Sequence, residues 1–169
     1  MSKEHAGLVV VGVDGTAEGD AALAFAVDEA ARSGDSVEVV TVWHPLVPPL
    51  SYPVLPVGAT PVDREALRRS AEEVQQEALE RVSVPPGVPV STRVLEGDPG
   101  QVLVEAARTA RLLVVGSRAL GYVRAALLGS VSRYCAHHAA VPVVVVPAAQ
   151  PSHEHGTQAV ERMASATTP

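Results

Sequence analysis

The sequence has few aromatic residues, one cysteine, no excess of basic residues and no long apolar run. Aromatic residues make up only 3% of the 169 residues, so valine, alanine and leucine must build any core. The single cysteine, Cys135, excludes an intramolecular disulfide and is typical of a reducing cytoplasm. The net charge of -6 argues against nucleic-acid binding, which requires a basic patch. We therefore expect a cytoplasmic protein that does not bind nucleic acid.

The apolar runs are short. The run at residues 8–13, near the N-terminus, is interrupted by Gly12 and followed by Asp14, which makes it too short for a signal peptide or a membrane span. The composition, 47% hydrophobic and 19% charged, is typical of one globular domain at this length. We predict that this domain occupies residues 1–147 and that the polar tail, 148–169, is disordered. No membrane association is expected.

Apolar residues alternate between two kinds of segment. Short, valine-rich runs are typical of strands buried on both faces of a parallel sheet, and apolar residues at helical spacing predict the helices between them. Pro89, inside one predicted strand, favours a place at the edge of the sheet. The segment 44–62 is rich in proline and predicts a long loop. The predicted strands cover residues 8–13, 36–43, 88–95, 112–116 and 141–146, and the predicted helices begin at Thr16, Asp63, Asp98 and Gly129.

This order of strands and helices predicts the fold class α/β. We expect a single doubly wound domain with a five-stranded parallel sheet, strand order 3-2-1-4-5, and helices on both faces. Ligands of such sheets bind beyond the carboxyl ends of the strands, where the strand order reverses. That point lies between the first and fourth strands, so the segments 13–16 and 116–121 should border a binding site.

A loop rich in glycine and serine follows the fourth predicted strand, from Gly116 onward. It lacks the P-loop pattern, because Tyr122 and Val123 stand where Lys and Ser/Thr would be needed, and no Gly-x-Gly-x-x-Gly is present. The helix predicted to begin near Gly129 offers free N–H groups to an anion, and Arg118 lies nearby. Taken alone, such a loop is equally typical of a simple turn.

Several longer motifs resemble the universal stress protein family. They are "VVVGVDGT", "EGDP", "VVGSR", "LLGSVS" and "PVVVVP", and the resemblance covers roughly residues 7–147. The ATP-binding branch of that family has the pattern Gly-x2-Gly-x9-Gly-Ser/Thr after its fourth strand. Here this pattern aligns with Gly116 and Gly129-Ser130, and Ala119 stands in place of the second glycine.

The resemblance implies a set of site residues around a bound ATP, with Mg²⁺ held through the phosphates. Gly12, Asp14 and Val42 would lie at the adenine end, and Gly116 with Ser117, Arg118, Ala119 and Gly121 would border the ribose and phosphates. The phosphate tail would lie against Gly129, Ser130, Val131 and Ser132. Because Ala119 replaces a glycine, we expect the phosphate end to be bound less tightly than the family pattern implies.

The implied function is that of an ATP-binding regulator or sensor in the stress response, without efficient hydrolysis. No general base, catalytic residue or metal site is identified in the sequence. Two alternatives remain open: a nucleotide-free dimeric interaction module, and an enzyme of the same fold that cleaves or adenylates. The flat apolar strand at 141–146 predicts a homodimer, which the resemblance also implies. The regulatory protein partner is unknown.

Overall fold

The computed structural model describes residues 7–45, 63–117 and 128–147, and five strands form one parallel sheet within them. The strand order is β3-β2-β1-β4-β5, which confirms the predicted order and the α/β fold. The strands are β1 (Leu8–Gly12), β2 (Ser36–Trp43), β3 (Val90–Glu96), β4 (Leu112–Gly116) and β5 (Val143–Val146). The helices are α1 (Ala17–Ser33), α2 (Arg64–Arg81), α3 (Pro99–Ala106) and α4 (Ser130–His138).

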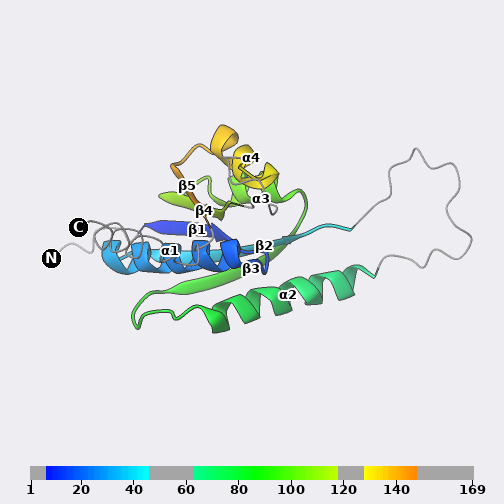
Figure 1. Ribbon diagram of the computed structural model, residues 1–169, viewed down its shortest axis with the longest axis horizontal. Helices are drawn as coiled ribbons and strands as arrows, with labels where there is room; N and C mark the ends of the chain where they lie inside the picture. The colour runs from blue at the N-terminus through cyan, green and yellow to red at the C-terminus, as the bar shows by residue number, and fades with distance from the viewer. Residues whose placement is uncertain (1–6, 46–62, 118–127, 148–169) are drawn as a thin grey trace, which may run out of the picture.

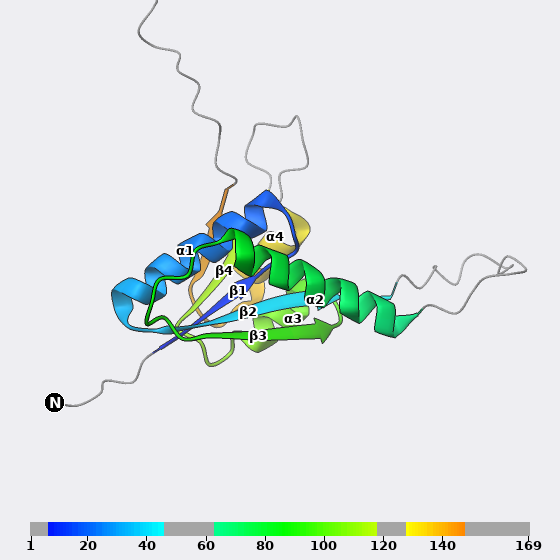
Figure 2. The ribbon, with the colours of Figure 1, turned by 90° about the horizontal axis from the view of Figure 1, so that it is seen from below.

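The helices cover both faces of the sheet. Helices α1 and α2 lie on one face, and α3 and α4 lie on the other (Figure 1). Helix α2 runs alongside β2 and β3 at one edge of the sheet (Figure 2). The crossovers therefore wind in both directions from β1, which leaves the reversal of strand order between β1 and β4.

Valine is the commonest residue of the core, which is built from the three inner strands β1, β2 and β4 and from the helices that cover them. Val9 and Val11 of β1 point into the cluster under α1 and α2, whereas Val10 points into the cluster under α3 and α4. All three side chains have no exposed surface, as expected for a strand with both faces covered. Closely packed small and branched side chains thus fill the core, which has few aromatic residues.

Three of the four predicted helix starts are confirmed by side-chain caps. Thr16 accepts a hydrogen bond from the N–H of Gly19, Asp63 from Ala66, and Asp98 from Gln101. Gly34 ends α1 with a φ of 75°, a left-handed conformation that favours glycine.

Two predicted strands begin later than expected, and a proline precedes each of them. The strand predicted at 88–95 begins at Val90 after Pro89, and the one predicted at 141–146 begins at Val143 after Pro142. A proline has no N–H to donate, but its carbonyl oxygen accepts. Pro89 accepts from Val37 at 2.9 Å, and Pro142 accepts from Leu113 at 3.0 Å. The first predicted strand is also shorter and ends at Gly12.

Both of the prolines lie at strands on the edges of the sheet, as Pro89 predicted. Residues 46–62 of the loop predicted at 44–62, and the whole of the tail predicted at 148–169, lie outside the described residues, so these remain predictions. No helix in the described ranges combines the length and the apolar composition that crossing a membrane would require.

Candidate functional site

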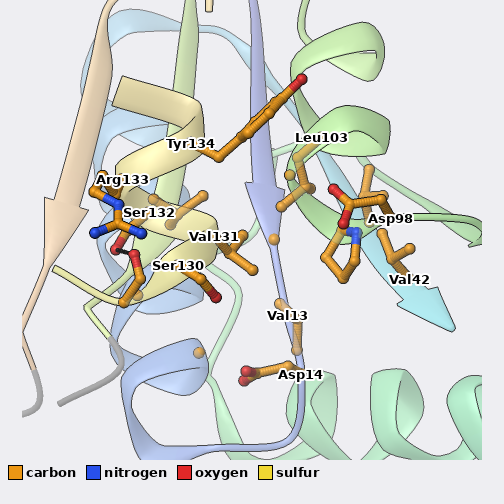
Figure 3. Close-up of a pocket in the computed structure, with 18 of the residues that line it drawn as sticks. Val13, Asp14, Val42, Asp98, Leu103, Ser130, Val131, Ser132, Arg133 and Tyr134 are labelled. Carbon is orange, nitrogen blue, oxygen red and sulfur yellow. Dashed lines mark hydrogen bonds between the residues drawn. The ribbon is translucent and has the colours of Figure 1, made fainter. Parts of the chain in front are cut away.

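A cavity of about 710 Å³ lies at the carboxyl ends of the strands, at the reversal between β1 and β4. The ends of β1, β2 and β4 border it, together with the N-terminal turns of α1, α3 and α4. Its place is the one that the strand order predicts for a ligand site. Figure 3 shows Asp14 beyond the end of β1, with Ser130 and Val131 of α4 on one side and Asp98 and Val42 on the other.

Most of the predicted site residues come together in this cavity. The lining includes Gly12, Asp14, Val42, Gly116, Gly129, Ser130, Val131 and Ser132. Ser117 is described but does not line the cavity; its N–H donates to the carbonyl oxygen of Val146 instead. The predicted residues Arg118, Ala119 and Gly121 lie outside the described residues.

Two of the predicted glycines allow close packing around the cavity. A Cβ atom at Gly12 would lie 2.8 Å from the Leu103 side chain, and one at Gly116 would lie 2.8 Å from the carbonyl oxygen of Glu18. Glycine therefore lets α3 approach β1 and lets the first turn of α1 approach the end of β4. These contacts place two helix N-termini at the cavity.

Three helices begin at the cavity, and their N-termini differ. Helix α1 is capped by Thr16 and helix α3 by Asp98, whereas α4 begins at Gly129 with no side-chain cap. The first N–H groups of a helix have no partner within it. In α4 these are the N–H groups of Ser130, Val131 and Ser132, and all three residues line the cavity. The start of α4 can thus donate hydrogen bonds to an anion.

The side chain of Ser132 is not directed to a ligand. Ser132 is 1% exposed, and its hydroxyl donates to the carbonyl oxygen of Gly129 at 3.1 Å. Its contribution to the cavity is therefore its backbone N–H, and the hydroxyl holds the first turn of α4 closed.

The lining also contains residues that the sequence analysis did not identify as site residues. Leu103, His44 and Tyr134 line the cavity, as does Asp98, which was predicted only as a helix cap. Parallel strands bring all strand-to-helix junctions to the carboxyl ends of the strands. The position of Asp98 just before α3 could therefore have predicted that it lines the cavity. Tyr134 gave no signal, because its place depends on how α4 packs against α3.

Tyr134 closes the space between α3 and α4. Its ring stacks on that of His138, with a centroid distance of 4.0 Å and an interplanar angle of 16°. On α3, a Cβ atom at Gly100 would lie 2.7 Å from the Tyr134 ring. Figure 3 shows Tyr134 reaching from α4 across to α3. The two helices are therefore in direct contact along the side of the cavity.

The charged groups at the cavity are of both signs. Asp14, Glu18 and Asp98 supply carboxylates, and Arg133 supplies a guanidinium group. Behind the cavity, burial raises the pKa of the Cys135 thiol to about 11, with a smaller contribution from the charge of Asp98. Residues 7–45, 63–117 and 128–147 include no cluster of three or more His, Cys, Asp or Glu side chains that could hold a metal ion.

Comparison with known proteins identifies relatives over most of the chain. A universal stress protein of Mycolicibacterium smegmatis is 34% identical over 140 residues, which are 82% of this chain and 47% of that protein. A universal stress protein of Mycobacterium tuberculosis is 39% identical over 139 residues, 81% of this chain and 44% of that protein. The chain thus spans less than half the length of these two relatives.

Solved structures include a universal stress protein in complex with cAMP. It is 27% identical to this chain with a TM-score of 0.53, and the match covers 85% of this chain and 98% of that one. The model of the universal stress protein family matches residues 7–147. This range includes all of the strands and helices described above, and the match agrees with the resemblance of the motifs. The chain belongs to the universal stress protein family.

Proposed function

We propose that the cavity binds an adenine nucleotide, with ATP as the ligand that the sequence pattern predicts. The protein then acts as a nucleotide-dependent regulator or sensor and does not hydrolyse ATP efficiently. The observation that carries this proposal is the uncapped N-terminus of α4 beside two capped ones. Mg²⁺ would bind through the phosphates of the ligand.

The phosphate end is assigned to the start of α4. The N–H groups of Ser130, Val131 and Ser132 and the positive end of the helix dipole favour a negatively charged group. The cAMP that is bound by a related protein of known structure carries both an adenine and a phosphate, which supports this class of ligand.

The base end is assigned to the opposite side of the cavity. Val40 and Val42 of β2 and Leu103 of α3 supply apolar surface there, which suits the faces of a purine ring. Asp14 supplies a hydrogen-bond acceptor at the end of β1, which suits a donor on the adenosine moiety.

Binding without efficient hydrolysis is supported by the state of two nucleophilic side chains of α4, Ser132 and Cys135. The Ser132 hydroxyl is buried and donates to the backbone, and the Cys135 thiol, with a pKa of about 11, stays protonated at neutral pH. Neither group is available as an activated nucleophile. Hydrolysis or adenylation remains the alternative function that a product assay must test.

The test of the phosphate site is a proline substitution at the first residue of α4. Ser130→Pro removes the N–H of Ser130, and a proline is tolerated at this helical position. Gly129 has a ψ of 162°, the extended conformation that a residue before proline prefers. The matched control, Ser130→Ala, removes the hydroxyl and keeps the N–H.

We expect Ser130→Pro to weaken ATP binding by about ten-fold or more, because hydrogen bonds to charged groups are strong. Ser130→Ala should weaken it less, and adenosine, which lacks phosphate, should bind both variants as it binds the wild type. Binding is measured by calorimetry or by the fluorescence of Trp43, the only tryptophan of the chain, which is adjacent to the lining residues Val42 and His44. Equal losses for adenosine and ATP would contradict the assignment.

A second measurement separates the three functions. Labelled ATP incubated with the protein should be recovered intact and bound. Release of product above a mock preparation would favour an enzyme, and no binding would favour a nucleotide-free interaction module.

We also infer that β5 pairs with β5 of a second copy in a symmetric homodimer. Within the described sheet β5 is an edge strand and pairs with β4 alone. Its four valines are half-buried, so the edge offers both unpaired backbone groups and apolar surface. An exposed apolar edge of this kind is a template for pairing with another chain.

A further inference from the structure

Thr16, the cap of α1, donates hydrogen bonds to the Asp14 carboxylate, and Gly19 in the first turn of α1 leaves space for it. We propose that Thr16 and Gly19 are positioning residues that fix the Asp14 carboxylate as a hydrogen-bond acceptor for the adenosine moiety of the ligand. This inference rests on the proposed binding of an adenine nucleotide.

Thr16 makes contacts in two directions. Its hydroxyl donates to Oδ1 of Asp14 at 2.6 Å and accepts from the N–H of Gly19 at 3.1 Å. Its backbone N–H also donates to Oδ1 of Asp14, at 3.2 Å. One carboxylate oxygen is therefore held by two donors from the same residue, and that residue is in turn held by the helix.

Gly19 leaves the space that the carboxylate occupies. A Cβ atom at this position would lie 2.8 Å from Oδ1 of Asp14 and 3.3 Å from its backbone nitrogen. Gly19 is buried within α1, where glycine is the least favourable residue after proline. A larger residue would favour the helix but would displace the carboxylate.

The cap of α1 does not itself require this carboxylate. In α2 and α3 the caps are Asp63 and Asp98, so a carboxylate there accepts directly from the helix. In α1 the cap is Thr16, and the carboxylate comes two residues earlier, where Asp14 lines the cavity. The arrangement of α1 thus places the carboxylate at the ligand and leaves the capping to a hydroxyl.

The chemistry of a carboxylate defines the part of the ligand that it faces. An ionised carboxylate accepts hydrogen bonds only, so it needs a donor on the ligand. Adenosine offers the 6-amino group of the base and the hydroxyl groups of the ribose. Inosine lacks the amino group, and 2′-deoxyadenosine and 3′-deoxyadenosine each lack one of the ring hydroxyls, so the three analogues separate these sources.

The central experiment uses Gly19→Ala, which removes no hydrogen-bonding group. We expect it to weaken the binding of both ATP and adenosine by about five-fold, the loss of roughly one hydrogen bond. Its melting temperature should not fall, because alanine favours the helix more than glycine does. Thr16→Val should weaken binding by a similar factor. Thr16→Ser, which keeps the hydroxyl, should bind with the affinity of the wild type.

Two controls separate positioning from a general effect on the fold. Asp63→Ala removes the cap of α2 away from the cavity, and it should lower the melting temperature and leave affinity unchanged. In an Asp14→Ala background, adding Gly19→Ala should cause no further loss of affinity, because the group that Gly19 accommodates is gone.

The results distinguish this inference from the proposed function. Absence of adenosine and ATP binding by the wild-type protein overturns both. Binding by the wild type, with the same five-fold effect of Gly19→Ala whether or not Asp14 is present, overturns the positioning role alone. The preference for adenosine over at least one of inosine, 2′-deoxyadenosine and 3′-deoxyadenosine should shrink in Asp14→Ala; three unchanged preferences would also overturn the positioning role.

Discussion

The Nε atom of Arg111 lies 2.6 Å from Oδ2 of Asp35, at the amino ends of the strands. Asp35 is 5% exposed and also accepts from the hydroxyl of Ser33 at 2.6 Å and the N–H of Gly7 at 2.7 Å. Burial acts to raise the pKa of Asp35, but hydrogen bonds from Ser33, Arg111 and Gly7, together with the charge of Arg111, lower it below its ordinary value. The ionised carboxylate thus joins the start of β1 to the end of α1 and to the residue before β4.

This interaction predicts how stability changes with pH. Because the pKa of Asp35 is lower in the folded state than the ordinary 3.8, its contribution is present above that pH and is lost as pH falls through the folded value. Asp35→Asn should lower the free energy of unfolding by about 2 kcal/mol at pH 7 and by less in acid. Urea unfolding of both proteins between pH 7 and pH 2 measures this. The control is Glu105→Gln, which breaks an exposed pair with Arg108; a penalty for Asp35→Asn that does not depend on pH would contradict the prediction.

A carboxylate introduced at Gln75 should destabilise the fold when it is ionised, the opposite of what the ionised Asp35 does. The buried side-chain amide of Gln75 donates from α2 to the carbonyl oxygens of Val39 on β2 and Arg93 on β3, both at 3.0 Å. Gln75→Glu would place a carboxylate against these oxygens, which raises its folded-state pKa and should destabilise the fold by about 3 kcal/mol at pH 7. The penalty should shrink as the pH falls, because a protonated carboxyl group can donate.

Gln75→Met is the matched variant, since it loses the amide and adds no charge. It should be less destabilised at pH 7 and show no such pH dependence in urea unfolding. Equal stability of the two variants across the pH range would contradict the predicted penalty for the ionised carboxylate.

Cys135 should be unreactive in the folded protein. Its side chain has no exposed surface, and its pKa of about 11 leaves little thiolate at pH 8. Iodoacetamide labelling, followed by mass spectrometry, should be slow for the native protein and fast in concentrated urea. Similar rates in both conditions would contradict the burial of this thiol.

The proposed homodimer predicts that a proline in β5 separates the subunits. The carbonyl oxygen of Pro142 accepts from Leu113 of β4, and that of Val146 accepts from Ser117, just after β4. By the alternation of a parallel ladder, the backbone groups of Val143 and Val145 therefore point outward. Val145→Pro removes one outward N–H without removing a bond to β4. Light scattering should give a dimer mass for the wild type and a monomer mass for this variant at micromolar concentration.

The opposite edge of the sheet supplies the control for that experiment. Thr92 of β3 lies on the outward side of its strand by the same alternation, so Thr92→Pro makes the same change at the other edge. It should leave the dimer intact. A monomeric wild type, or a dimer that Val145→Pro does not affect, would contradict pairing through β5.

The sequence predicted the fold and much of the candidate site for identifiable physical reasons. Valine runs such as Val9–Val11 and caps such as Asp98 are local signals, and the order of strands and helices then determines which ends meet. Packing distances are not local. The contact of Gly116 with Glu18, and the Tyr134 ring between α3 and α4, depend on how separate helices approach one another. For the same reason, the sequence did not predict that Gly19 leaves space for the Asp14 carboxylate.

The strand β1 runs from the stabilising interactions of Asp35, at the amino ends of the strands, to the cavity at their carboxyl ends. Gly7, just before β1, donates to Asp35, and Gly12 at the other end of the strand lines the cavity. A strand of this length spans about 17 Å, well beyond the range at which substitutions usually influence one another. Residues at the amino ends of the strands can therefore be changed, by engineering or during evolution, without a change in ligand selectivity. In turn, residues at the carboxyl ends of the strands can change and alter ligand selectivity without a loss of the fold.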